Sequence, residues 1–173
     1  MNALPDIRAA HVDDAATLAR FLRDVFLLAY GHCSTPANVA GHVDGVYGEA
    51  IQARELASPA FPTLVAHDEQ GMAAAAQLHL GGAAPDGVPG NRPVELRRFY
   101  VAERWHGRGL ADALMARVVA DAAPHGDVLW LSAWQEAPRA VGFYRRHRFD
   151  IAAETIFVVG DDPKRDWAMA RRI

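Results

Sequence analysis

The sequence predicts one α/β (α+β) domain over residues 1–173, built on a mixed sheet of about seven strands with helices on both faces. Two observations predict this class. Segments with helical spacing of apolar residues alternate along the chain with short apolar runs of strand character. The chain has 173 residues, of which 51% are hydrophobic, so it is long enough for one well-buried core and short for two.

The first third of the chain predicts one short strand followed by two helical regions. Residues 7–10 form the strand, and residues 11–30 place their apolar side chains at helical spacing. Thr35-Pro36 opens the second region, because proline suits the first turn of a helix. This region runs to about Leu56. Its glycines predict a broken helix or a mobile segment, and they are Gly41, Gly45 and Gly48.

The rest of the chain predicts mainly strands, with two further helices between them. A hairpin surrounds residues 68–71, whose composition is typical of a tight turn, and a flexible loop occupies residues 81–93. The remaining elements then follow as strand, helix, strand, helix, strand and strand. They cover residues 94–102, 107–123, 127–134, 138–147, 151–160 and 166–173.

Composition and charge exclude several classes of function. The formal net charge is -3 at pH 7, whereas general nucleic-acid binders need a broad basic face to displace counterions. No apolar run approaches the ~20 residues of a membrane span, and the first thirty residues lack a signal-peptide pattern. The single cysteine, Cys33, has no partner for an internal disulfide. We therefore expect neither nucleic acid nor membrane as a partner, and a reduced, cytoplasmic setting.

A glycine-rich turn joins a predicted strand to a predicted helix. The first N–H groups of a helix have no intrahelical partner, and the helix dipole adds partial positive charge there. Gly107 and Gly109 allow close approach of a ligand, and His106 and Arg108 add donors. The turn thus predicts a phosphate or pyrophosphate site, although a plain helix start with solvated arginines fits this stretch equally. It matches neither the nucleotide P-loop nor the dinucleotide fingerprint.

Two motif blocks give the sequence a resemblance to the GCN5-related N-acetyltransferase (GNAT) superfamily. The first family block is a strand ending in hydrophobic-Val, followed by Gln/Arg-x-x-Gly-x-Gly/Ala at the start of a helix. Here Tyr100-Val101 ends the strand, and Gly109 and Ala111 stand at the matching helix-start positions. His106 stands where Gln or Arg is usual, and it still offers a hydrogen-bond donor.

The second family block, Asn-x-x-Ala-x-x-Phe-Tyr-x-x-x-Gly-Phe, corresponds to residues 137–149. The matching residues are Ala140, Phe143, Tyr144 and Phe149. Ala137 replaces the Asn and Arg148 replaces the Gly. The resemblance covers nearly the whole chain, because the order of strands and helices also agrees. A looser likeness, in residues 94–101 and 155–173, is to the bacterial spermidine/spermine acetyltransferases.

The resemblance implies direct transfer of an acetyl group from acetyl-CoA to the primary amine of a small acceptor, a polyamine if the looser likeness holds, without a metal. Acetyl-CoA would lie where the strands at 94–102 and 128–134 splay apart. The implied cofactor-binding residues are the backbone of Phe99, Tyr100 and Val101 along the pantetheine arm, the amides of Gly107, Arg108, Gly109, Leu110, Ala111 and Asp112 around the pyrophosphate, and His106 and Tyr144 beside them.

Two residues are the candidates for proton transfer. Tyr144 matches the family's tyrosine acid, since a phenol with a pKa near ~10 suits donation to a thiolate whose thiol pKa is about 8.5. The alternative is a core aromatic. Glu95 is the candidate base, acting through water. Strand alternation places Glu95, Arg97 and Phe99 on one face, so an ion pair with Arg97 or another arginine fits Glu95 equally, as does binding of a cationic substrate.

Rival functions share the same fold. The acceptor could be an amino acid, an antibiotic or a protein N-terminus, and a non-catalytic acyl-CoA sensor would explain the changes at Ala137 and His106. Homodimers are common in the superfamily, so the resemblance leaves a homodimer open. No metal site is predicted, because the histidines lack metal-ligand spacing; they include His32, His42 and His79.

Overall fold

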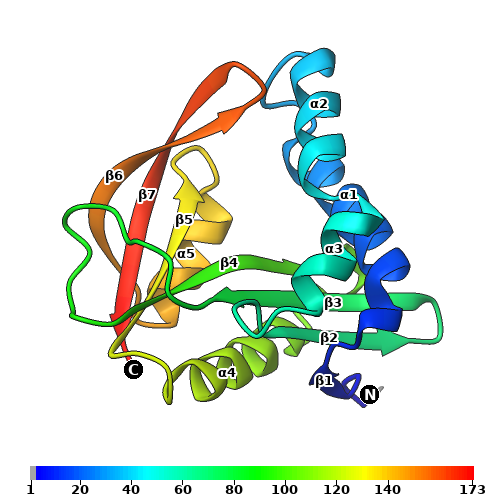
Figure 1. The fold of residues 1–173 in the computed structure, drawn as a ribbon, viewed down its shortest axis with the longest axis horizontal. Helices are drawn as coiled ribbons and strands as arrows, with labels where there is room; N and C mark the ends of the chain where they lie inside the picture. The colour runs from blue at the N-terminus through cyan, green and yellow to red at the C-terminus, as the bar shows by residue number, and fades with distance from the viewer. Residues whose placement is uncertain (1–2) are drawn as a thin grey trace.

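The computed structural model describes residues 3–173, which form a seven-stranded mixed sheet with helices on both faces (Figure 1). The elements are β1 Ile7–Ala9, the 3-10 helix η1 Val12–Asp14, α1 Ala15–Tyr30, α2 Pro36–Val46, α3 Glu49–Leu56, β2 Thr63–Asp68, β3 Gly71–His79, β4 Pro93–Val101, the 3-10 helix η2 Glu103–Trp105, α4 Leu110–Ala122, β5 Val128–Trp134, α5 Pro138–Arg146, β6 Asp150–Val159 and β7 Asp162–Arg172. The strand order is β1-β2-β3-β4-β5-β7-β6. The predicted fold class is therefore confirmed.

Different helices cover the two faces of the sheet. In β3, Gln77 faces α3 and bonds Glu55 through Nε2 at 3.3 Å, whereas the neighbouring Ala76 and Leu78 border the α4 side. Figure 1 shows α1 and α3 on one side of β2–β4 and α4 on the other. Helix α5 lies on the α4 side, since Phe99, paired with Ala76, packs against its aromatic side chains. The face toward α3 thus carries the polar Gln77–Glu55 contact, and the face toward α5 carries the aromatic contact of Phe99.

The region from 35 to 56 is two helices rather than one. The Thr35 hydroxyl accepts a hydrogen bond from the Asn38 amide at 3.3 Å, and Pro36 follows at the first turn, as the sequence predicts. The break falls at Gly48, which is extended and begins α3. The predicted interruption is confirmed there. Gly41 and Gly45 instead lie inside α2 and do not break it.

Two boundaries differ from the sequence prediction, each for a backbone reason. The helix expected from Gly107 begins at Leu110, because Gly107 and Gly109 have φ values of +71° and +87°, which a right-handed helix cannot include. The connection expected at residues 161–164 is mostly strand. β6 and β7 pair up to a two-residue turn at Gly160-Asp161, where Gly160 has φ +67°.

β4 and β5 are adjacent parallel strands that separate after a short paired segment. Their register joins only three residue pairs, ending at Glu95 and Trp130, and all other neighbouring strands are antiparallel. Beyond this segment the strands diverge, as Figure 1 shows for the green β4 and the yellow β5. The predicted splay is confirmed. The sheet is divided into one arm of β1–β4 and another of β5, β7 and β6.

Candidate active site

A β-bulge in β4 determines which side chains face the opening between the arms. Gln77 pairs with Arg98 and the next residue, Leu78, pairs with Leu96, so Arg97 is the extra residue without a partner. Glu95, Arg98 and Tyr100 therefore share the face toward α1–α3. Phe99 turns to the opposite face. The alternation predicted for Glu95, Arg97 and Phe99 is wrong for Phe99, because the bulge shifts the period by one residue, whereas Glu95 and Arg97 both line the cleft described below.

A cleft of about 310 Å³ lies between α1–α2 and the opening of the sheet. Its polar lining includes Glu95 of β4 and Asp166 of β7, one from each arm. Its aromatic lining comes from α1, the C-cap of α2, β4, β5 and β6, and it includes Phe26, Tyr30, Tyr47, Tyr100, Trp134 and Phe157. An aromatic enclosure with carboxylates suits an organic ligand that carries positive charge.

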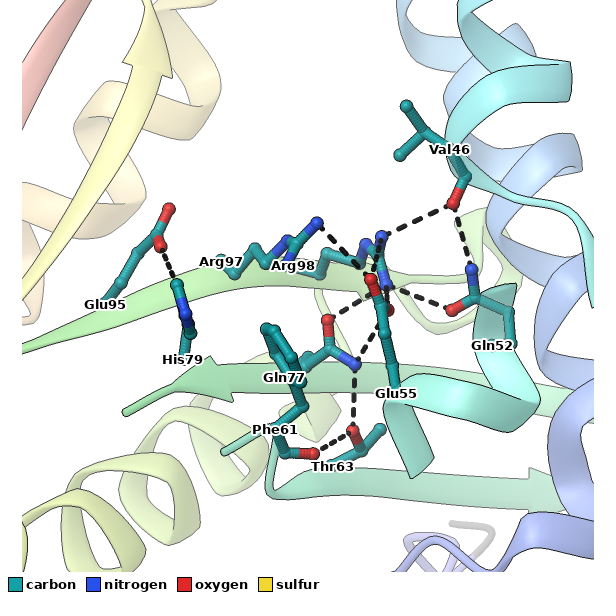
Figure 2. Close-up of polar contacts among 10 residues, drawn as sticks. All are labelled: Val46, Gln52, Glu55, Phe61, Thr63, Gln77, His79, Glu95, Arg97 and Arg98. Atoms are coloured by element: carbon teal, nitrogen blue, oxygen red, sulfur yellow. Dashed lines mark hydrogen bonds and ion pairs between the residues drawn. The ribbon is translucent and has the colours of Figure 1, made fainter. Parts of the chain in front are cut away.

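Glu95 is paired with a histidine rather than an arginine. His79 Nδ1 lies 3.0 Å from Glu95 Oε2 across the β3–β4 pair, and the imidazole stacks on Phe61 at a centroid distance of 4.7 Å (Figure 2). Both side chains are partly exposed, at 30% for His79 and 23% for Glu95. Arg97 is paired with Glu55 at 3.3 Å instead. The Glu95–Arg97 ion pair, one of the alternatives predicted for Glu95, is therefore wrong.

A buried polar network fixes the floor of the cleft (Figure 2). Arg98 Nη1 donates to Gln52 Oε1 at 3.0 Å, to Gln77 Oε1 at 2.9 Å and to the Glu55 carboxylate. Its guanidinium also lies over the Tyr47 ring, 5.5 Å from the centroid. The network ties α3 to β3 and β4 beside the bulge. Since Arg98 is only 5% exposed and fully engaged, it positions this part of the site.

Tyr144 lies on α5 and packs within an aromatic group. Its ring centroid is 6.3 Å from Phe99, 5.5 Å from Phe143 and 5.8 Å from Phe149. The ring thus has the core contacts that the alternative interpretation requires. Burial first, and then the nearby Tyr30, raise the pKa of Tyr144 well above that of an exposed phenol. The hydroxyl is therefore protonated at neutral pH, which is the state a proton donor needs.

The glycine turn presents backbone donors at the open end of β4. The first N–H to close an intrahelical bond is that of Ala113, which donates to Gly109 O at 3.0 Å. Gly109 is the helix N-cap and has no side-chain cap. A Cβ at Gly107 or Gly109 would meet nothing within 4 Å, so the backbone faces open space. The Arg108 amide already donates to the Trp105 carbonyl at 3.2 Å, whereas the other amides between Gly107 and Asp112 have no backbone partner within residues 3–173. These uncommitted amides beside open space fit the pyrophosphate of coenzyme A.

The predicted side-chain donors of this turn differ in their availability. His106 Nε2 is 3.0 Å from the Val101 carbonyl and donates to it, so both groups are engaged with each other. Leu110 is completely buried and offers only its amide. The Asp112 carboxylate is bonded by His147 Nε2 at 2.9 Å. Arg108 is exposed and, across residues 3–173, its side chain makes no hydrogen bond or ion pair.

Other groups near the site are also accounted for. Cys33 lines the cleft, and burial raises the pKa of its thiol, which disfavours a thiolate nucleophile. Across residues 3–173, no three His, Cys, Asp or Glu side chains gather where they could hold a metal ion. None of the helices described there is long and apolar enough to cross a bilayer.

The chain belongs to the GNAT family of acetyltransferases, because the acetyltransferase (GNAT) domain family matches residues 59–151. It is an N-acetyltransferase that takes its acetyl group from acetyl-CoA. The sequence is similar to a Mycobacterium tuberculosis protein named an uncharacterised N-acetyltransferase, at 32% identity over 161 residues, covering 92% of this chain and 98% of that protein. An N-acetyltransferase of Lactobacillus delbrueckii is 24% identical over 87% of both chains.

Solved structures show the same fold at low sequence identity. The paiA N-acetyltransferase of Thermoplasma acidophilum, in complex with coenzyme A, matches with a TM-score of 0.75 at 14% identity, covering 97% of this chain and 98% of that one. NAA60 of Arabidopsis thaliana, in complex with acetyl-CoA, matches with a TM-score of 0.72 at 14% identity, covering 97% and 98%. At such identities the likeness concerns the fold.

Three further residues line the cleft without being predicted from the sequence, and they are Asp166, Ser132 and Tyr47. The Tyr47 hydroxyl lies 3.2 Å from that of Tyr100, a residue for which the resemblance implies only a backbone role. A signal for Asp166 was present. It alternates with Ala168 and Ala170 in the closing strand, which places a charged residue on a buried face. The position of Ser132 depends on strand pairing and had no local signal.

Proposed function

We propose that residues 1–173 act as one domain that transfers the acetyl group of acetyl-CoA directly to a primary amine of a small, polyamine-like acceptor bound in the cleft. The observation that carries the proposal is the splay between β4 and β5. It connects the donor-rich glycine turn at one side of the sheet with the carboxylate-bearing aromatic cleft at the other. A thioester bound along the splay would therefore face an amine bound in the cleft.

The chain's residues supply binding on the donor side. Backbone groups of Phe99 and Tyr100 lie on the segment of β4 that has no β5 partner, and they are available to pair with an extended arm. The Val101 carbonyl is engaged by His106, which limits that pairing at the end of the strand. The amides of Gly107 and of Gly109 to Asp112 would hold the pyrophosphate, together with the Arg108 guanidinium, which has no partner within residues 3–173. The acetyl-CoA thioester supplies the activated carbonyl.

Two side chains would move protons. Glu95, with His79 behind it, would accept a proton from the acceptor's ammonium group through water, which frees the nitrogen lone pair. The nitrogen forms a bond to the thioester carbonyl carbon as the carbon–sulfur bond breaks, and it loses its second proton to water, so that a neutral amide is formed. Glu95 then releases its own proton to solvent. Tyr144 would give its proton to the departing sulfur and regain one from solvent. The raised pKa of Tyr144 keeps its hydroxyl protonated before transfer.

The first experiment measures thiol release from acetyl-CoA by the purified protein with polyamines, amino acids, aminoglycosides and short peptides. Amine-dependent release with a polyamine, together with an acetylated product by mass spectrometry, supports the proposal. Release with amino acids, aminoglycosides or peptides alone would replace the polyamine by that acceptor class. Binding of acetyl-CoA without release from any amine would indicate the acyl-CoA sensor instead.

A further inference from the structure

We infer that Asp166 binds a protonated amine of the acceptor other than the one acetylated, so that the cleft selects amines with a second positive charge. The inference rests on the proposed function and names the chemistry of the acceptor. It starts from one buried carboxylate on β7. Asp166 is 4% exposed, lines the cleft and pairs in register with Trp134 at the open end of β5.

One oxygen of this carboxylate has no partner within residues 3–173. Asp166 Oδ2 accepts a hydrogen bond from the Ser132 hydroxyl at 2.7 Å, whereas Oδ1 is buried and unbonded. Of the three buried side-chain polar atoms without a partner in that part of the chain, two line this cleft, Asp166 Oδ1 and His42 Nε2. Such atoms are costly in a folded protein unless a ligand satisfies them.

The surroundings of Asp166 favour a cation over a neutral donor. The Tyr30 and Trp134 rings stand edge to face beside it, with centroids 6.1 Å apart, and aromatic faces attract ammonium groups. The lysine and the arginines of the cleft are already paired. Lys164 bonds Asp162 at 2.8 Å, and Arg97 and Arg98 both contact Glu55. Burial raises the pKa of Asp166, so a cationic ligand beside it would stabilise its charged form.

The two carboxylates of the cleft are placed to hold two ends of one molecule. Glu95 pairs in register with Trp130, and Asp166 pairs with Trp134. The two acidic residues therefore lie opposite positions of β5 that are four residues apart. At the rise of an extended strand this corresponds to about 13 Å along β5. His42 Nε2 borders the same cleft and can contact an intervening N–H group. An extended aliphatic diamine or polyamine fits this spacing better than a compact amine.

The test compares amines that differ only at the far end, using wild type, Asp166→Asn and Asp150→Asn. Asp166→Asn keeps an acceptor for Ser132 and removes the charge, and Asp150→Asn is a matched control at an exposed carboxylate outside the cleft lining. For cadaverine and spermidine, Asp166→Asn should raise KM by about 10- to 100-fold with kcat nearly unchanged. The KM for pentylamine should not change, and Asp150→Asn should resemble wild type with every amine.

Three results would overturn the inference. The first is an unchanged KM for cadaverine and spermidine in folded Asp166→Asn. The second is an equal loss of kcat with cadaverine and pentylamine together with a shifted pH profile, because that would make Asp166 the base. The third needs no variant and therefore does not depend on folding of Asp166→Asn. It is a wild-type kcat/KM for pentylamine or delta-aminovalerate equal to that for cadaverine.

Calorimetry separates this inference from the proposed function. If wild type acetylates no amine, the proposed function fails, and spermidine binding to the complex with coenzyme A still tests Asp166. Binding that is about 10- to 100-fold weaker in Asp166→Asn would support the amine site without turnover. If the wild-type complex with coenzyme A does not bind spermidine, the amine site at Asp166 is ruled out.

Discussion

Replacing Arg148 by glycine is expected to stabilise the protein. Arg148 follows α5 with φ +67°, and it is the only non-glycine residue within 3–173 that has a positive φ. An L-residue pays about 1–2 kcal/mol for this left-handed conformation. Glycine has no such penalty. However, glycine gives the unfolded chain more conformational freedom, which lowers the free energy of unfolding by about 0.4–1 kcal/mol. The net gain is about 0.5–1 kcal/mol, which corresponds to a rise in Tm of about 1–4 °C for a domain of this size.

Thermal and urea denaturation of wild type, Arg148→Gly and Arg148→Ala would test this reasoning. Alanine removes the guanidinium but keeps the Cβ, so the backbone penalty stays and no rise in Tm is expected. Arg148 also lies near Arg171, whose pKa is lowered first by burial and then by Arg148. If Arg148→Ala stabilises the protein as much as Arg148→Gly, relief of charge repulsion is the cause and the strain argument is refuted.

Three further predictions concern the proposed roles and one structural ion pair. Tyr144→Phe should lower kcat by about 100-fold or more while coenzyme A affinity changes little, and an unchanged kcat would end the acid assignment. Gly109→Asp should weaken acetyl-CoA binding in calorimetry more than Gly109→Asn, because both fit a positive φ but only Asp adds negative charge at the helix start; equal affinities would contradict the pyrophosphate site. The Asp68 carboxylate accepts hydrogen bonds from Arg104, Trp105 and the Gln70 amide, and these contacts hold its pKa far below its usual range. The contribution of Asp68 to stability is therefore complete above about pH 4 and is lost as the pH falls below that value. Asp68→Asn should therefore cost about 1–3 kcal/mol in urea denaturation at pH 7 and less in acid, and a cost independent of pH would argue against the ion pair.

The sequence was sufficient for the fold because its signals are local or form contiguous motifs. Helical periodicity, the proline at α2 and the glycines at 107 and 109 each determine backbone conformation nearby. The splay followed from the resemblance and is confirmed by the short β4–β5 pairing. The roles of Tyr144, Glu95 and the amides of the glycine turn remain predictions.

The contacts of the site depend on long-range register, which local pattern does not contain. The bulge at Arg97 arises from the pairing of β4 with β3, so strict alternation assigned Phe99 to the wrong face. The partner of Glu95 comes from His79, 16 residues earlier, and the partner of Asp166 comes from Ser132, 34 residues earlier. Such pairs are defined only once the strands are placed side by side.

The divergence of β4 and β5 also has a consequence for how the protein behaves in solution. It creates two strand edges in the interior of a sheet, and unpaired edges are templates for association with other chains. The outer edge at β1 is only three residues long, which limits association there. Within residues 3–173, His106 blocks the inner edge of β4 at the Val101 carbonyl. We expect coenzyme A, by covering the inner edges, to suppress aggregation during concentration and refolding.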